Sequence, residues 1–161
     1  MTRPWTRTFV VAIAVVLLPA AVPAQDKGAA DDFFTVFHLS DTQYYSQKHR
    51  RIFLRQTTWI ASNARKEHIA FVTHTGDVVQ HGGADNEEEW RNADRALSAL
   101  DGAVPWGVAP GNHDYDRVSA KVEPASMFVK TFGPARFKDR PWYCGHSQNG
   151  LNACQLITRG A

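Results

Sequence analysis

Three short polar clusters carry the side chains of this chain that are best suited to chemistry. They are Asp41-Thr42-Gln43, Gly76-Asp77 and Gly111-Asn112-His113-Asp114. Carboxylate and amide oxygens are hard ligands for divalent ions, and a histidine can bind a metal or act as a general acid. Each cluster alone is typical of an ordinary turn, because Asn, Asp and Gly dominate turns. Their chemistry therefore depends on whether the fold brings the three clusters together.

Each cluster directly follows a short apolar run that predicts a buried β-strand. The runs are residues 33–39, 69–73 and 104–108. Residues 50–66 between the first two runs have a helical pattern. A second helix is predicted from Asp85 to Asp101, with glutamates in its first turn. The order strand, helix, strand, helix, strand is typical of right-handed βαβ units, so the sequence predicts an α/β fold with a parallel sheet.

In such a sheet the three polar clusters meet at one edge, beyond the carboxyl ends of the strands. We expect Asp41 and Gln43 to share one ion, since residues i and i+2 at a strand end point the same way. Asp77 would project over the sheet edge, and Asn112 would supply a neutral oxygen ligand to a second ion. Two ions about 3.5–4 Å apart can orient a water against a phosphate ester, and His113 is placed to protonate the leaving oxygen.

These clusters resemble the first three motifs of the calcineurin-like metallophosphoesterases, over roughly residues 33–158. The resemblance implies a layered αββα sandwich and two divalent ions, Fe, Zn or Mn. It implies Asp41 and Gln43 on the first metal, Asp77 bridging both metals, Asn112 on the second, His113 as the catalytic acid and Asp114 orienting that histidine. Gln43 replaces the histidine of the usual first motif, D-x-H, as it does in some branches of the family.

The family pattern continues with a further metal-binding histidine and a G-x-H or G-H-x-H motif. The segment Gly145-His146-Ser147-Gln148 offers a Gly-His pair, but a glutamine stands where the second histidine belongs, and we expect no metal there. We therefore expect an incomplete sandwich. Two hypotheses follow: a metal-dependent phosphoesterase acting on phosphomonoesters or phosphodiesters, or a truncated fragment of weak or no activity that binds at most one metal or phosphate. An exposed sheet edge in such a fragment would favour self-association.

The first 24 residues have the pattern of a secretory signal peptide. Arg3 and Arg7 precede an apolar run at residues 9–18, and Val22-Pro23-Ala24 provides small residues for cleavage. The alternative is a membrane anchor, but the run is about half of the roughly 20 residues that span a bilayer. The sequence thus predicts a signal peptide (1–24), a linker (25–32) and a partial phosphoesterase domain (33–161). The mature protein would be secreted or periplasmic, without a membrane span.

Charge and cysteine content restrict the partners. The chain has 18 basic and 16 acidic side chains, and cleavage after Ala24 would make the two numbers equal. A neutral chain offers no electrostatic footprint for nucleic acid, so a phosphate ester is the expected partner. The cysteines are Cys144 and Cys154. They either pair, as close cysteines in exported proteins often do, or remain free thiols on separate strands.

The remaining segments are predicted from weaker patterns. A short helix is expected at residues 124–132, a loop at 134–150 and a strand at 151–158. His38 and His74 lie within strands and are expected to be packed side chains. Glu87 to Glu89 are expected to form only a helix N-terminus, without a role in a site.

Overall fold

The computed structural model describes residues 33–117 and 124–158. The predicted signal peptide and linker lie outside these residues. Among the helices of the described part, none is both long and apolar enough to cross a membrane.

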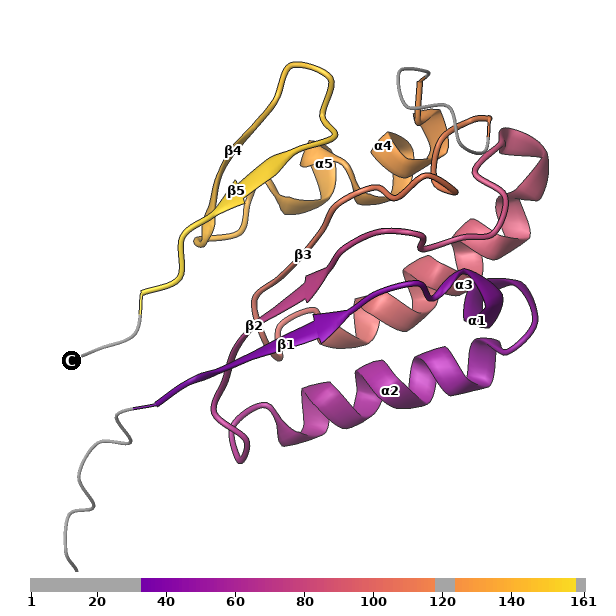
Figure 1. Ribbon diagram of the computed structural model, residues 1–161. Coiled ribbons are helices and arrows are strands. Elements are labelled where there is room, and N and C mark those ends of the chain that lie inside the picture. The colour runs from indigo at the N-terminus through magenta and orange to yellow at the C-terminus, as the bar shows by residue number, and fades with distance from the viewer. Residues whose placement is uncertain (1–32, 118–123, 159–161) are drawn as a thin grey trace, which may run out of the picture. The chain divides into compact units, whose positions relative to one another are not determined.

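A parallel sheet of three strands in the order β1-β2-β3 organises the described domain (Figure 1). The strands are β1 (Thr35–Leu39), β2 (Ile69–His74) and β3 (Trp106–Val108). In the central strand, Val72 is paired with Phe37 on one side and with Trp106 on the other. All three strands run in the same direction, so their carboxyl ends meet at one edge. The α/β prediction is confirmed.

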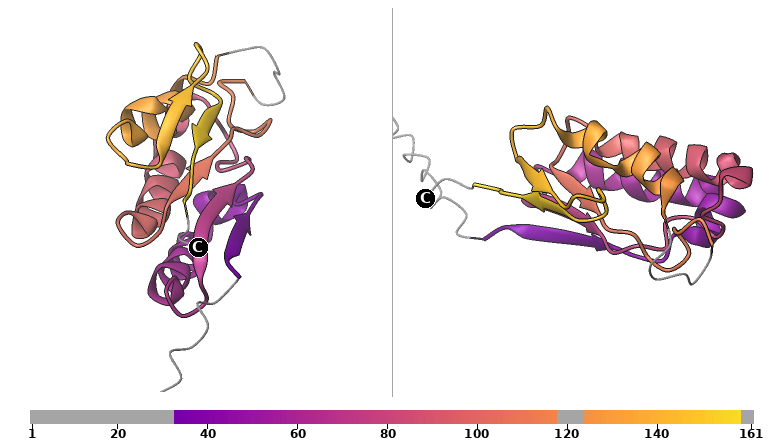
Figure 2. Two further views of the ribbon diagram at one scale, coloured as in Figure 1. Left: turned by 90° about the vertical axis from the view of Figure 1, so that its left-hand side faces the viewer. Right: turned by 90° about the horizontal axis from the view of Figure 1, so that it is seen from above.

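Two long helices cover one face of this sheet, as the turned views show (Figure 2). They are α2 (Arg50–Asn63) and α3 (Glu87–Leu97). A period of two in β2 directs alternate residues to the helices, and a period near 3.6 in each helix supplies the matching apolar stripe. The central side chains of this core are almost fully buried: Phe53, Ile60, Val72, Trp90 and Leu97. The helices thereby fix the sheet edge that carries the polar clusters.

The boundaries of helices and strands differ from the predicted ones where turns replace the expected ends of these elements. The first long helix ends at Asn63, and turns lead from there to β2. The second is flanked by the 3₁₀ turns η1 (Ala84–Asn86) and η2 (Ser98–Leu100). The third strand begins at Trp106 because the amide of Val104 still bonds to the carbonyl of Leu100, and the following proline has no N–H to give to a ladder.

The C-terminal part contains more regular structure than the sequence predicted. Helix α4 (Ser126–Phe132) is close to expectation, but the predicted loop 134–150 is wrong because it holds helix α5 (Pro134–Phe137) and strand β4 (Tyr143–His146). Strand β5 (Ala153–Gln155) pairs antiparallel with β4. Aromatic packing organises this segment: the Phe137 ring lies 4.9 Å from that of Trp106. Such long-range contacts have no local sequence signal.

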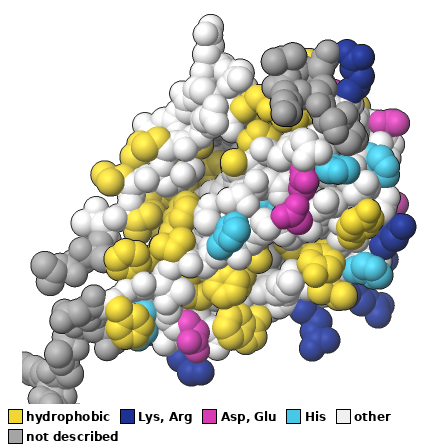
Figure 3. Space-filling model, viewed as in Figure 1, with side chains coloured by type: hydrophobic (Ala, Val, Ile, Leu, Met, Phe, Trp, Pro, Cys, Tyr) yellow, Lys and Arg dark blue, Asp and Glu magenta, His cyan; other side chains and the backbone are white. Residues whose placement is uncertain are grey.

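The other face of the sheet is partly open. Phe34 and Val36 are 62% and 51% exposed, and Figure 3 shows hydrophobic side chains gathered on the viewed face. Gln155 of β5 lies against this face, with its amide next to Gly107. Strand β1 is paired on one side within the described sheet. Self-association through this edge stays a prediction.

Candidate functional site

Direct contacts join the three polar clusters at the carboxyl edge of the sheet. We call residues 40–43 the first loop, residues 76–83 the second loop and residues 109–116 the third loop. The amide of Asp41 donates to the carbonyl of Gly76 at 3.1 Å, and the amide of His113 donates to Asp77 Oδ1 at 2.9 Å. A Cβ on Gly76 would lie 2.3 Å from the nitrogen of Gly111. The predicted convergence of the motifs at one edge is therefore present, and it depends on glycine where the second and third loops touch.

Asp41 and Asp77 share a rare backbone conformation. Both have φ of 53°, in the left-handed region that non-glycine residues seldom adopt. This conformation costs roughly 1–2 kcal/mol for most side chains, and such residues cluster at functional sites. The two strand ends thus turn abruptly at the two carboxylates that were predicted as metal ligands.

Gln43 reaches the site by a different route from the predicted one. Its expected position rested on strand alternation with Asp41, but Gln43 is the first residue of the short helix α1 (Gln43–Gln47). With the amide oriented so that Nε2 donates, it bonds to the carbonyl of Asp41 at 2.9 Å and to that of Asp77 at 3.2 Å. In this orientation Oε1 is the atom that the predicted metal ligation would use. Gln43 therefore bridges the first and second loops.

His113 is half-buried and held by the second loop. Its Nδ1 lies 2.9 Å from the carbonyl oxygen of Gln80, which can only accept, so Nδ1 carries a proton. Nε2 is left as the nitrogen that can exchange a proton with a ligand. The predicted acid is thus held in a defined orientation by a backbone carbonyl.

Asp114 is fully buried and does not hold the imidazole directly. Its Oδ1 accepts from the amides of Val78 and Val79 at 2.8 and 3.1 Å, and its Oδ2 accepts from the amide of Gly111 at 2.8 Å. Burial raises the pKa of this carboxyl to about 6, against the lowering effect of the three amides. The predicted orienting role is corrected in its geometry: Asp114 ties the second loop to the third, and any effect on His113 passes through the backbone.

Glu89 is a site residue that sequence reasoning missed. Its Oε2 accepts from the amides of Gln80 and His81 at 2.8 and 3.0 Å, and its Oε1 lies 2.9 Å from His81 Nδ1. Glu89 lies in the first turn of α3 as predicted, but it is buried and its carboxylate holds the second loop. Its spacing of four and seven residues before Ala93 and Ala96 places it on the buried face of α3, and this was the available signal.

His74 is a structural histidine, as predicted. Its Nδ1 accepts from the amide of Gly76 at 3.1 Å, so the proton is on Nε2, which lies 2.9 Å from Thr42 Oγ1. Desolvation by burial lowers its pKa to about 4, although Asp41 raises the value; His38 adds to the lowering. A neutral His74 therefore links the first and second loops. His38, in contrast, is exposed rather than packed, with its Nε2 on Thr75 Oγ1.

Comparison with known proteins agrees with this geometry. The model of the family described as calcineurin-like phosphoesterase matches residues 34–155. The chain belongs to the calcineurin-like phosphoesterase family. It is 39% identical over 130 residues to "Uncharacterized protein YvnB" of Bacillus subtilis (strain 168), covering 80% of this chain and 10% of that protein. The chain thus spans about a tenth of the length of this curated relative. No solved structure matches the chain.

The predicted metal ligands of this chain include two amide side chains in addition to carboxylates. Within residues 33–117 and 124–158, no three His, Cys, Asp or Glu side chains lie close enough together to hold a metal. The predicted set contains two carboxylates, of Asp41 and Asp77, and two amides, of Gln43 and the exposed Asn112. These donors fit an oxygen-ligated divalent ion, since hard oxygen sets suit ions such as Mn²⁺. His146 bonds instead to the hydroxyl of Tyr143 at 2.8 Å, within the β4–β5 hairpin.

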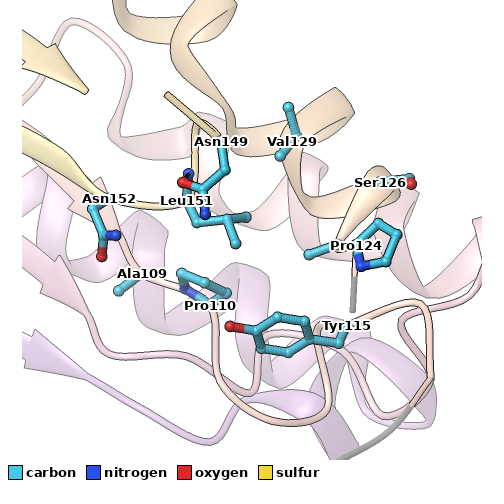
Figure 4. A pocket seen from close by; sticks show the side chains of 10 residues that line it. Ala109, Pro110, Tyr115, Pro124, Ser126, Val129, Asn149, Leu151 and Asn152 are labelled. Carbon is cyan, nitrogen blue, oxygen red and sulfur yellow. Dashed lines mark hydrogen bonds between the residues drawn. The ribbon is translucent and has the colours of Figure 1, made fainter. Parts of the chain in front are cut away.

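A pocket of about 580 Å³ lies beside the third loop of this phosphoesterase domain. Pro110 and Tyr115 form one wall, and Asn149, Leu151 and Asn152 from the segment between β4 and β5 form another (Figure 4). Among the residues that the structure describes, those lining the pocket carry no charge. The pocket places neutral polar and apolar groups next to the motif that carries His113.

Proposed function

We propose that this chain is an exported, metal-dependent phosphoesterase that hydrolyses phosphomonoesters or phosphodiesters. The observation that carries the proposal is the convergence of Asp41, Gln43, Asp77 and His113 at one sheet edge through direct contacts. Phosphoester hydrolysis is what membership of the calcineurin-like family suggests.

The residues take separate roles in this proposal. Asp41 and Gln43 would hold one divalent ion, Asp77 would bridge two, and Asn112 would hold the second, with Fe, Zn or Mn as the ions. When bound, such ions neutralise the phosphate and lower the pKa of a water. The hydrogen bond from Nδ1 to the carbonyl of Gln80 orients His113, so that Nε2 faces the leaving oxygen and donates a proton to it.

The test uses the purified chain with aryl phosphate mono- and diesters and added Mn²⁺, Fe²⁺ or Zn²⁺. Loss even of partners that only orient metal ligands typically costs about 10- to 100-fold. We therefore expect Asp77→Asn to lower kcat/KM by about 100-fold or more and to reduce the content of both metals. Asp85→Asn makes the same chemical change at an exposed position and should alter neither. Unchanged metal content and rate in Asp77→Asn would exclude the bridging role.

A second candidate function is favoured by the ligand set. Because the predicted ligands are two carboxylates and two amides rather than several histidines, the chain alone would bind one metal or phosphate and turn over slowly or not at all. Calorimetric titration with Mn²⁺ separates the candidates. One ion per chain without ester hydrolysis supports this second function, whereas two ions with sustained turnover support the first.

Export is proposed from the pattern of residues 1–24. Expression of the full chain in a bacterial host should yield a secreted or periplasmic product that begins at Gln25, and N-terminal sequencing of that product tests the proposal. Self-association through the β1 edge is also proposed, because Val36 of β1 and the preceding Phe34 are exposed and β1 pairs on one side within the described residues. A sedimentation coefficient that stays that of a monomer at rising concentration would contradict it.

A further inference from the structure

Cys144 and Cys154 occupy facing positions on neighbouring strands. Cys144 lies in β4 and Cys154 in β5, and both are exposed free thiols. The register pairs Tyr143 with Gln155 and Gly145 with Cys154, with an irregularity between Tyr143 and Gly145. Two residues of β4, Cys144 and Gly145, therefore face the single residue Cys154, as in a β-bulge.

The electrostatics of the hairpin agree with this placement of the two thiols. Desolvation, followed by interactions with the Cys154 side chain, raises the pKa of the Cys144 thiol above its ordinary value. The Cys144 thiol itself faces the carbonyl oxygen of Trp142, 4.0 Å from the sulfur.

The connection between the strands is already folded into a tight turn. The amide of Ser147 donates to the carbonyl of Asn152 at 2.9 Å, and the amide of Asn152 donates to Ser147 Oγ at 3.1 Å. The amide of Gly150 donates to the carbonyl of Ser147 at 2.8 Å. The ends of the hairpin are thus held side by side before any bond forms, which removes most of the rearrangement that a new cross-link would require.

We propose that Cys144 and Cys154 form an intrachain disulfide by exchange with a low-molecular-weight disulfide. One cysteine loses its proton, and its sulfur attacks the small disulfide, which releases one small thiolate. The second cysteine then loses its proton and displaces the remaining small thiolate from the mixed disulfide. The two thiolates take up the two protons. One small disulfide is reduced to two thiols, and the protein dithiol is oxidised to one disulfide.

The cross-link would act on the pocket beside the third loop. The nine residues that it encloses include Asn149, Leu151 and Asn152, which line that pocket. Closing the loop restricts their freedom. The disulfide would therefore fix the hairpin wall of the pocket, and its reduction would loosen that wall. This inference does not depend on the proposed phosphoesterase activity.

The first test uses the native, folded chain with both cysteines as free thiols. After incubation with oxidised glutathione under native conditions, we expect the intact mass to fall by the mass of two hydrogen atoms. Neither cysteine should then react with iodoacetamide, and a proteolytic digest should contain peptides joined through Cys144 and Cys154. Two alkylated cysteines, a persistent glutathione adduct on each, or a disulfide-linked dimer would each overturn the proposal. No variant has to fold for this test.

The second test follows the hairpin. Amide hydrogen exchange of residues 147–152 should be slower in the oxidised chain than in the reduced chain. The double variant Cys144→Ser, Cys154→Ser provides the control, and its exchange should not respond to oxidant or reductant. If the verified disulfide leaves the exchange of these residues unchanged, the proposed effect on the pocket wall is wrong.

Discussion

The first and second loops each place an aspartate at φ of 53°, but they are supported very differently. In the second loop, four consecutive amides are bound by two buried carboxylates: those of Val78 and Val79 by Asp114, and those of Gln80 and His81 by Glu89. In the first loop, Asp41 is exposed, and its carboxylate accepts from Ser40 Oγ at 2.6 Å.

The first loop is in fact built against the second. The amide of Asp41 and the side chain of Gln43 donate to second-loop carbonyls, and Thr42 contacts His74 and the carbonyl of Val78. The second loop takes its support from α3 and from the third loop. We conclude that support runs in one direction, so damage to the second loop should spread to the first, whereas the reverse should not hold.

The largest effect should come from Gly82→Ala. A Cβ at Gly82 would lie 2.2 Å from the carbonyl oxygen of Tyr115 and 2.8 Å from that of His113, so backbone must move. We expect a loss of about 3 kcal/mol or more in the free energy of unfolding, measured by urea denaturation. Gly145→Ala is the matched control, since nothing lies within 4 Å of its Cβ. Equal stabilities of the two variants would show that the second and third loops are not tightly packed.

Removal of the Glu89 carboxylate should come next. Glu89→Ala leaves the amides of Gln80 and His81 without their acceptor, which should cost about 2–3 kcal/mol of stability. The carbonyl that holds His113 then moves, so kcat should fall about 10- to 100-fold. Glu88→Ala is the control, because Glu88 is exposed and its 3.8 Å ion pair with Arg50 contributes little. A Glu89→Ala chain as stable and active as Glu88→Ala would refute the supporting role.

A fall in pH should lower the free energy of unfolding through His74, the histidine that links the first and second loops. Between pH 6.5 and about 4, the unfolded chain holds a proton on this histidine that the folded chain lacks, so stability falls as pH falls. From pH 7 to pH 5 we expect a loss of about 2 kcal/mol that is missing in His74→Gln. Asp114 acts with the opposite sign in this range, but both proteins retain it, so it cancels in the difference. Parallel stability curves would mean that His74 titrates normally.

The smallest effect is expected for Ser40→Ala. This variant removes the hydrogen bond to Asp41 Oδ2 in an exposed loop, and solvent replaces the lost partner. We expect less than about 1 kcal/mol in the free energy of unfolding and no change in hydrogen exchange at the second loop. A loss as large as that of Glu89→Ala would show that the first loop also carries the site, and the proposed direction of support would be reversed.

The order of strands and helices along the chain and the position of the three motifs after the strands were predictable because each depends on local patterns. Apolar runs predicted the strands. The helical spacing of Trp90, Ala93, Leu97 and Leu100 is also visible in the sequence, and all four side chains are buried. The predicted ligands remain predictions, although direct contacts now link Asp41, Gln43 and Asp77.

The parts that sequence reasoning missed depend on contacts between distant residues. The helix at Gln43 forms because Thr42 and Ser46 are both buried against the carbonyl of Val78, more than 30 positions away. The buried role of Glu89 depends on amides of the second loop, and β4 forms where β5 is available to pair. A window of neighbouring residues contains none of this information.

The shared left-handed conformation of Asp41 and Asp77 also limits which residues can replace them over evolution. Asn tolerates this conformation about as well as Asp, and glycine tolerates it best. Glu would adopt it less readily, and its longer side chain would also move the carboxylate away from its present position. Descendants of this sequence that lose these carboxylates should therefore change first to Asn or Gly at the two positions. If a family member has Glu at either position, we expect the backbone at the end of that strand to differ from the one described here.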